Sequence, residues 1–217
     1  HTMIEKSILS LPDYEFNNKF ILFDGHSKEG LLKDEYDAYK SFIAKKYPDF
    51  CVIAFRENIY FRDMIEQICR ISEARRLFII QDDVMAHKMD LKQIEIQMNY
   101  VKDLKILCFP HKYIGPEGTH WYEIIDDTYP LPFIKSHGFS ERIFICDRKN
   151  MLKICETKPK KNKMEKRFIE FIYNTAMNKS RWKEGYEDEK ERYWEDFGCY
   201  YHHDIYHTHL VGKRCIK

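Results

Sequence analysis

No stretch of this sequence approaches the ~20 consecutive apolar residues that a membrane-spanning helix requires. The opening residues His1 to Lys6 also lack the hydrophobic region of a secretory signal peptide. These two absences argue against a membrane span and predict a soluble, cytoplasmic protein. The chain contains no internal repeat or low-complexity tract, and its 217 residues suffice for one full-sized domain. We therefore expect a single domain.

The sequence has no excess of charge of either sign. Charged residues make up 33% of the chain, but they nearly cancel to a formal net charge of +1 at pH 7. This balance excludes the general electrostatic attraction that draws basic proteins onto nucleic acids or anionic membranes. We expect no nucleic-acid partner, and any ligand must be recognised by a local group of residues.

Paired cysteines of the Cys-x-x-Cys kind are absent, and the total of seven cysteines is odd. Cys51, Cys108 and Cys146 fall within predicted strands, where a cysteine behaves as a small buried apolar residue. The cysteines therefore indicate a reducing compartment rather than a disulfide framework.

Apolar runs of strand length alternate with helical patterns along most of the chain. The predicted strands are 20–23, 51–55, 77–80, 105–109 and 142–146, and the predicted helices are 35–46, 61–75, 90–101, 150–156 and a last one up to Lys179. This alternation predicts an α/β fold with a mixed, mainly parallel central sheet flanked by helices. Between the fourth and fifth strands, residues 110–137 are expected to form a long irregular loop of the kind that often binds ligands.

The most informative segment is the predicted strand Leu77 to Ile80, which ends abruptly in Gln81, Asp82 and Asp83. In open α/β sheets, ligands bind at the carboxyl ends of the strands. Two adjacent carboxylates at such an edge could bind a divalent cation together with a phosphorylated substrate. The alternative is that the two acids only solubilise a turn or cap the following helix.

Three segments, in this order, resemble the GT-A type of nucleotide-sugar-dependent glycosyltransferase, in particular its large inverting family typified by small bacterial enzymes. Residues 7–11 followed by 20–27 are similar to that family's helix end and strand closing in an Asp-x-x-Ser turn. Residues 77–83 look like the strand that ends in the Asp-x-Asp signature, and residues 193–198 look like the Trp/Gly-rich Glu-Asp segment. A small GT-A domain of this kind also resembles the glycosyltransferases that large algal DNA viruses encode for capsid decoration.

The resemblance implies a GT-A, Rossmann-like domain spanning residues 1–217. Its nucleotide-binding part would cover about residues 1–105 and its acceptor-binding part about residues 106–217. The implied reaction moves a hexose from a nucleoside-diphosphate sugar, a UDP-sugar by default, to a hydroxyl of a glycan or glycoprotein with inversion. The implied cofactor is Mn²⁺ or Mg²⁺, and a viral enzyme would work in the host cytoplasm.

The same resemblance assigns roles to individual residues. On the donor side, Asp24 would contact the nucleobase, and Asp83 would bind the metal with Asp82 as second choice. On the acceptor side, Asp196 would be the general base, with Glu195 as the next candidate. The remaining donor-side candidates are Gln81, which stands where the family has its first acid, and Arg56, which follows the strand 51–55. Arg56 could equally be an ordinary surface arginine.

The C-terminal part of the chain contains several potential metal ligands, which are Cys199, His202, His203, His207, His209 and Cys215. They could form a structural zinc site, although the spacing of the cysteines does not favour one. A single histidine, His209 or His207, could complete the catalytic metal shell, as in several GT-A families. The third interpretation is that these are histidines of the surface or the edge of the core.

Other interpretations of the whole chain remain open. Gln81 removes one acid of the signature, so only Asp82 and Asp83 supply carboxylates there. The alternatives to an enzyme are therefore a non-catalytic sugar- or protein-binding domain with a GT-A-like fold, and a zinc-stabilised interaction domain. The family also has a strand before the segment that residues 7–11 resemble. In this chain, either residues 7–11 form that strand or the strand is absent.

Overall fold

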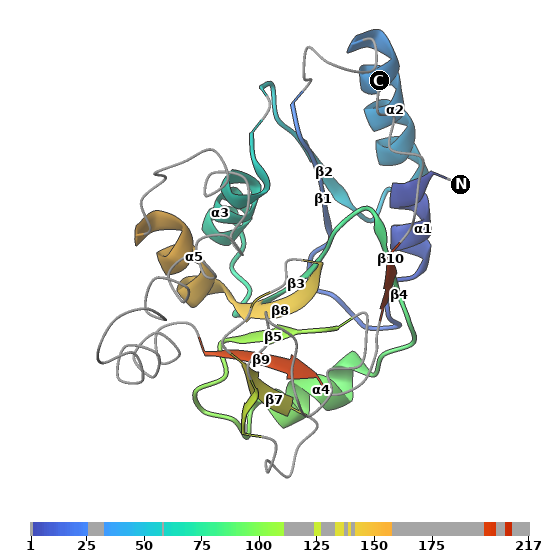
Figure 1. Cartoon of the computed structure of the whole chain (residues 1–217). Coiled ribbons are helices and arrows are strands. Elements are labelled where there is room, and N and C mark those ends of the chain that lie inside the picture. Colours follow the sequence, from blue (N-terminus) through green and yellow to red (C-terminus); the bar gives the residue numbers. More distant parts are fainter. Residues whose placement is uncertain are drawn as a thin grey trace.

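The structure is a computed structural model that describes residues 2–25, 33–57, 59–110, 124–126, 133–136, 139, 142–157, 198–202 and 207–209. These residues form an α/β fold in which helices flank a central mixed sheet (Figure 1). The predicted fold class, a mixed sheet flanked by helices, is confirmed.

The central sheet has six described strands, in the order β3 (Arg76–Ile80), β8 (Ile143–Asp147), β5 (Ile106–Cys108), β9 (Cys199–His202), β7 (Phe133–Ser136) and β6 (Ile124–Asp126). Only the β5–β9 pair is parallel among these strands, and the other four neighbouring pairs are antiparallel. The expected predominance of parallel pairing is therefore not found in this sheet. One reason is that β6 and β7 lie inside the segment 110–137, which the sequence presented as irregular.

Strands β1 (Phe20–Phe23) and β2 (Cys51–Ala54) form a separate parallel pair, connected through helix α2 (Lys33–Lys46). Alternate residues of this pair face opposite sides, as the period of a strand requires. Ile21 and Phe23 pack with Ile43 of α2, whereas Phe20 and Leu22 pack against the core of the central sheet. Figure 1 accordingly shows β1 and β2 between α2 on one side and helix α3 (Phe61–Ile71) on the other.

Each face of the central sheet carries its own apolar core. On one face, α3 and α5 (Arg148–Thr157) cover residues that include Ile106, Cys108 and Phe144. On the other face, α4 (Leu91–Met98) covers residues that include Leu107 and Ile145. Neighbouring residues of β5 and β8 thus point to opposite cores, which explains why both strands are continuous apolar runs in the sequence.

The cysteines mostly occupy one of these two cores. The buried ones are Cys69, Cys108, Cys146, Cys155 and Cys199, all on the face covered by α3 and α5. Burial raises the pKa of the Cys69 thiol to about 12, so this thiol remains protonated and unreactive at neutral pH. The six described cysteines are all free. Cys51 was expected to be buried because it lies in a strand, but its side chain is exposed.

Both ends of the described chain meet at strand β4 (Val84–Ala86). Helix α1 (Met3–Leu9) packs on β4 from one side, and β10 (His207–His209) pairs with it in antiparallel register (Figure 1). The segment 7–11 is therefore the end of a helix and its exit, not a first strand. None of the described helices is long and apolar enough to cross a membrane.

Helix α1 is fixed by a buried carboxylate, which gives a first prediction. Glu5 accepts hydrogen bonds from Lys46 Nζ at 2.5 Å and from the Thr2 backbone N–H at 2.8 Å. These contacts, the Lys46 bond foremost, lower the pKa of Glu5 from 4.5 to about 2. A group with a lowered folded-state pKa stabilises the fold above its unfolded value and loses that contribution as the pH falls. We expect the Glu5 contribution to disappear between about pH 4.5 and pH 2.

Thermal unfolding of the wild-type protein and of Glu5→Gln across pH 2 to 7 measures this contribution, with the window set by linkage between proton binding and folding. The difference in Tm between the two proteins should be largest at neutral pH and should close toward pH 2. Two curves that stay parallel across the whole range would show that Glu5 does not stabilise α1 in this way.

Candidate functional site

The two adjacent acids lie in a short turn, residues 81–83, which we name the acid loop. It leaves the carboxyl end of β3 and leads directly into β4. The Gln81 N–H donates to the Arg142 carbonyl at 3.0 Å, and the Val84 N–H donates to the Gln81 carbonyl at 3.3 Å. The Asp82 side chain is exposed, while Asp83 is half-buried and its Oδ1 atom is buried. The acid loop therefore presents two carboxylates at one end of the sheet, where the sequence predicted them.

The two carboxylates influence each other. The pKa of Asp82 is raised above its ordinary value, first because surrounding protein partly desolvates the carboxyl even though the side chain reaches solvent. The second cause is the negative charge of Asp83. Hydrogen bonds from the backbone N–H groups of Asp82 and Asp83 act in the opposite direction. A cation bound here would relieve the repulsion between the two acids.

Two serines join α1 to this part of the chain, Ser7 to the acid loop and Ser10 to β4. The Ser7 hydroxyl lies 2.8 Å from the Asp82 carbonyl and 3.5 Å from the Gln81 carbonyl, and it also contacts the Val84 carbonyl. The Ser10 hydroxyl accepts from the Ala86 N–H at 2.9 Å. The sequence pattern did not identify either serine, because contacts between an N-terminal helix and a distant turn leave no local signal.

Asp24 lies at the carboxyl end of β1, next to the chain that leaves β2. Its Oδ1 atom accepts from the Gly25 N–H at 2.7 Å and from the Ile59 N–H at 2.6 Å. Burial raises the pKa of Asp24, and these two backbone bonds counteract part of that rise. Asp24 therefore fastens the loop after β2 to the end of β1, a structural role that the sequence did not reveal.

Tyr36 of α2 lies beside Asp24. Its hydroxyl donates to the Asp24 carbonyl. Its pKa is raised, first by burial and then by the negative charges of Asp24, Asp37 and Asp82. Asp24 and Asp82 therefore both contribute to the raised pKa of this one phenol. Sequence reasoning missed Tyr36, although Tyr36 and Tyr39 one turn apart on α2 form a recognisable pair.

Arg56 follows β2 and is exposed. The preceding Phe55 N–H donates to the Phe23 carbonyl at 3.0 Å, so the chain after β2 runs beside the end of β1. Arg56 is thus placed at the same strand ends as Asp24.

The C-terminal histidines occupy different places. In the β4–β10 ladder, His209 is paired with Val84, the residue after Asp83, so the backbone of His209 lies beside the acid loop. His202 is instead buried in the central sheet, stacked on Phe109 and edge-on to Phe133. Within the described residues no group of three or more His, Cys, Asp or Glu side chains could hold a metal ion. The side chains of 207–209 and the candidates Glu195, Asp196, His203 and Cys215 lie outside the described residues.

The donor set of the acid loop fits one kind of metal site. Two neighbouring carboxylates are too few for a cation enclosed entirely by protein. They match the way in which Mg²⁺ is usually bound, by one or two carboxylates together with substrate phosphates and water. The residues present therefore fit a divalent cation shared with a diphosphate, held by Asp83 and Asp82.

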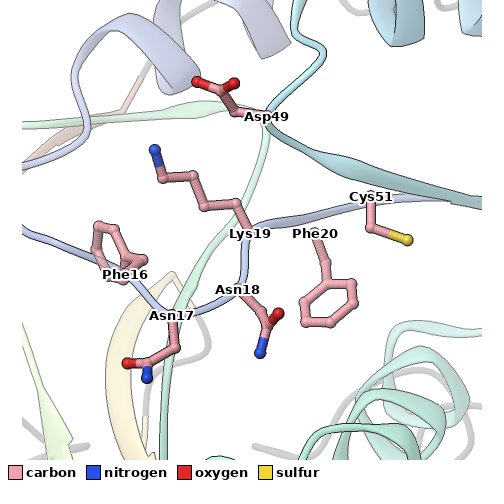
Figure 2. Close-up of a pocket in the computed structure, with 7 residues that line it drawn as sticks. All are labelled: Phe16, Asn17, Asn18, Lys19, Phe20, Asp49 and Cys51. Atoms are coloured by element: carbon pink, nitrogen blue, oxygen red, sulfur yellow. The ribbon is translucent and has the colours of Figure 1, made fainter.

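A separate hollow lies at the opposite end of β1 and β2. It has a volume of about 330 Å³ and is lined by Phe16, Asn17, Asn18, Lys19, Phe20, Asp49 and Cys51. Figure 2 shows that its polar groups do not converge, because Asn17 and Asn18 point away from Lys19 and Asp49. A binding site needs a few polar groups aimed at one ligand, so this hollow is not a comparable candidate.

No protein-family model and no curated protein matches the chain. Several solved structures are weakly similar to it. HddC from Yersinia pseudotuberculosis shares 14% identity at a TM-score of 0.37, over 56% of this chain and 55% of HddC, so the chain spans about half the length of that protein. A UDP-glucose pyrophosphorylase complexed with UDP-glucose shares 15% identity at a TM-score of 0.43, over 88% of this chain and 84% of that one.

A third similar structure is the UTP-bound UGPase from Acinetobacter baumannii, with 11% identity and a TM-score of 0.40 over 88% of this chain and 80% of that protein. Similarities at this level do not establish a family. The functional conclusion therefore rests on the acid loop, Asp24 and Tyr36.

Proposed function

We propose that this protein is a metal-dependent glycosyltransferase that moves a hexose from a nucleoside-diphosphate sugar to a hydroxyl of a glycan or glycoprotein, with inversion. The donor would be a UDP-sugar by default. The observation that carries the proposal is the pair Asp82 and Asp83 at the carboxyl end of β3. Residues of about 1–105 would bind the nucleotide, and those of about 106–217 the acceptor.

Glycosyl transfer passes through an oxocarbenium-like transition state while negative charge develops on the departing diphosphate. Mn²⁺ or Mg²⁺, when bound, supplies positive charge that stabilises this leaving group. Asp83 and Asp82 would hold the cation, and His209 is a third candidate from its place beside Val84. The two carboxylates at the end of β3 would favour a ligand that carries a diphosphate together with a bound cation.

Three further residues, Asp24, Arg56 and Gln81, would orient the nucleotide. Asp24 would accept a hydrogen bond from the nucleobase, in keeping with its position at the end of β1. Arg56, which is exposed, would neutralise phosphate charge. Gln81 carries an amide that could donate to a ribose or phosphate oxygen without adding negative charge.

The acceptor hydroxyl needs a base on the side of the sugar opposite the leaving diphosphate. Asp196, with Glu195 as the second candidate, would take this proton during attack. A positioned general base contributes about 10²–10⁴-fold to the rate. This part of the proposal is supported by the sequence resemblance of residues 193–198.

Calorimetric titration of the protein with UDP, GDP and dTDP, each with and without Mn²⁺, tests the proposal. We expect one of these nucleotides to bind at least about tenfold more tightly with Mn²⁺ present, since the acids alone would repel a diphosphate. A hydrolysis assay with the corresponding nucleotide-sugar should then show slow turnover.

Two results would overturn the proposal. Absence of binding to all three diphosphates would favour a non-catalytic or zinc-stabilised domain, and loss of the fold on chelation would identify the latter. Binding of UTP followed by release of pyrophosphate on addition of a sugar 1-phosphate would instead show nucleotidyl transfer. UTP belongs in the experiment because one of the weakly similar structures is UTP-bound.

A further inference from the structure

We infer that Ser7 is a positioning residue for the cation site, acting through the peptide that links Asp82 to Asp83. The inference rests on the proposed function, because it assumes that these two acids bind a cation. It adds a residue of α1, far from the acid loop in the sequence, to the site.

The contacts of Ser7 are concentrated on one turn of backbone. Ser7 is 4% exposed, and its hydroxyl lies 2.5 Å from the Val84 carbonyl and 2.8 Å from the Asp82 carbonyl, so its nearest acceptors stand on either side of Asp83. A hydroxyl has one proton, so it donates to one carbonyl at a time, while the other carbonyls remain within its reach. A buried donor among converging carbonyls fixes the turn that those carbonyls belong to.

The Asp82 carbonyl belongs to the peptide unit between the two acids. In a planar trans peptide the C=O and N–H bonds point in opposite directions, so holding the carbonyl also aims the N–H of Asp83. That N–H is one of the two backbone donors to the Asp82 carboxylate. Ser7 thereby fixes the rigid peptide that joins the two acids and contributes to the orientation of the Asp82 carboxylate.

Ser10, the C-cap residue of the same helix, offers a matched comparison. Its hydroxyl donates to the Ser7 carbonyl at 2.8 Å and accepts from the Ala86 N–H at 2.9 Å. Ser10 therefore helps to dock α1 on β4, as Ser7 does, but it contacts the backbone beyond the acid loop. A change at Ser10 tests docking of the helix, whereas a change at Ser7 tests docking and the orientation of Asp82 together.

Removing the Ser7 hydroxyl should therefore weaken cation binding more than it weakens the fold. Outer-shell groups that orient metal ligands typically affect metal affinity by about 10–100-fold. We expect Ser7→Ala to raise the apparent Kd for Mn²⁺ about tenfold in the presence of saturating UDP. Binding of UDP without Mn²⁺ should stay within about twofold of wild type, because Ser7 acts on the site only through the acid loop.

The experiment is a titration of Mn²⁺ into wild type, Ser7→Ala and Ser10→Ala at saturating UDP, with Tm measured for each protein. The inference predicts that the two variants lose similar stability but that only Ser7→Ala binds Mn²⁺ more weakly. Ser7→Cys keeps a side chain of similar size with a weaker donor, and it should give an intermediate Kd. If Ser7→Ala does not fold, Ser7→Cys takes its place in the comparison.

The outcomes separate this inference from the proposed function. If wild type binds UDP with Mn²⁺ and the Ser7 variants bind it equally well, the positioning role is wrong and the proposed function stands. Equal weakening in Ser7→Ala and Ser10→Ala would also overturn the positioning role, since helix docking alone would explain it. If wild type shows no Mn²⁺-dependent binding, the proposed function fails and this inference fails with it.

Discussion

Replacing Asp83 with Asn is expected to lower the affinity for UDP in the presence of Mn²⁺ by about 100-fold or more. This loss exceeds the usual effect of changing a group that only orients a metal ligand. Asn has nearly the shape of Asp, so the change removes the charge with little change in packing. The negative charge of Asp83 is also one cause of the raised pKa of Asp82. In Asp83→Asn the pKa of Asp82 should therefore move down toward its ordinary value. Calorimetry measures the first effect, and NMR titration of the carboxyl group measures the second.

Asp49→Asn is the matched control. It removes the same charge at an exposed position before β2, and the parallel pairing of β1 with β2 places this position at the opposite end of the strands from Asp24. We expect it to leave Mn²⁺-dependent binding within about twofold of wild type, since exposed charges at a distance are screened by salt. Equal losses in both variants would indicate a general charge effect. Unchanged binding in Asp83→Asn would remove Asp83 from the site.

Gly198→Ala is expected to destabilise the protein by about 3 kcal/mol, because two separate penalties coincide at this position. Gly198 has a φ of 52°, which lies in the left-handed region that side chains rarely adopt. A Cβ atom there would lie 2.2 Å from the carbonyl oxygen of Asp103. The Gly198 carbonyl also accepts from the N–H groups of Lys105 and Ile106, at the start of β5. The backbone can therefore relieve the clash only by disturbing the parallel pair β5–β9.

Thermal unfolding should show a fall in Tm of about 6–12 °C for this change in a protein of this size. Gly198→Asn separates the two penalties, because Asn tolerates the left-handed region but still carries a Cβ atom. We expect Gly198→Asn to recover only a small part of the loss. Near wild-type stability in Gly198→Asn would show that the conformation of residue 198, and not the contact with Asp103, is limiting.

The sequence located elements wherever a local pattern decides the structure. The apolar runs at 20–23, 51–55 and 77–80 correspond to β1, β2 and β3, and Asp90 caps α4 by accepting from the Gln93 N–H. Asp147 similarly accepts from the Asn150 N–H at the start of α5. These features depend on residues within one turn or one strand, so no knowledge of the tertiary structure was needed.

The sequence did not locate elements that form through distant pairing. Strands β6 and β7 are short and lie in a segment rich in Gly and Pro, and β7 obtains its partner from β9, far along the chain. The direction of the strand pairs was missed for the same reason. A pattern of alternating strands and helices shows where strands lie, but it does not show which strands pair or in which direction.

The candidate site shows the same division. The position of Asp82 and Asp83 after β3 could be predicted, because a strand ending in two acids is a local pattern. The contributions of Ser7 and Tyr36 could not, because each depends on how a helix packs against the ends of distant strands. Glu195 and Asp196 stay predictions.

The pairing of β4 with β10 also bears on how the protein is made. During synthesis, β4 leaves the ribosome long before residues 207–209, so its pairing edge remains open while the rest of the chain is translated. Open strand edges are where nascent chains mispair with one another. The antiparallel ladder beside the acid loop can close only after residues 207–209 have been translated, and nascent chains that stop before residue 207 should aggregate more readily than chains that contain these residues.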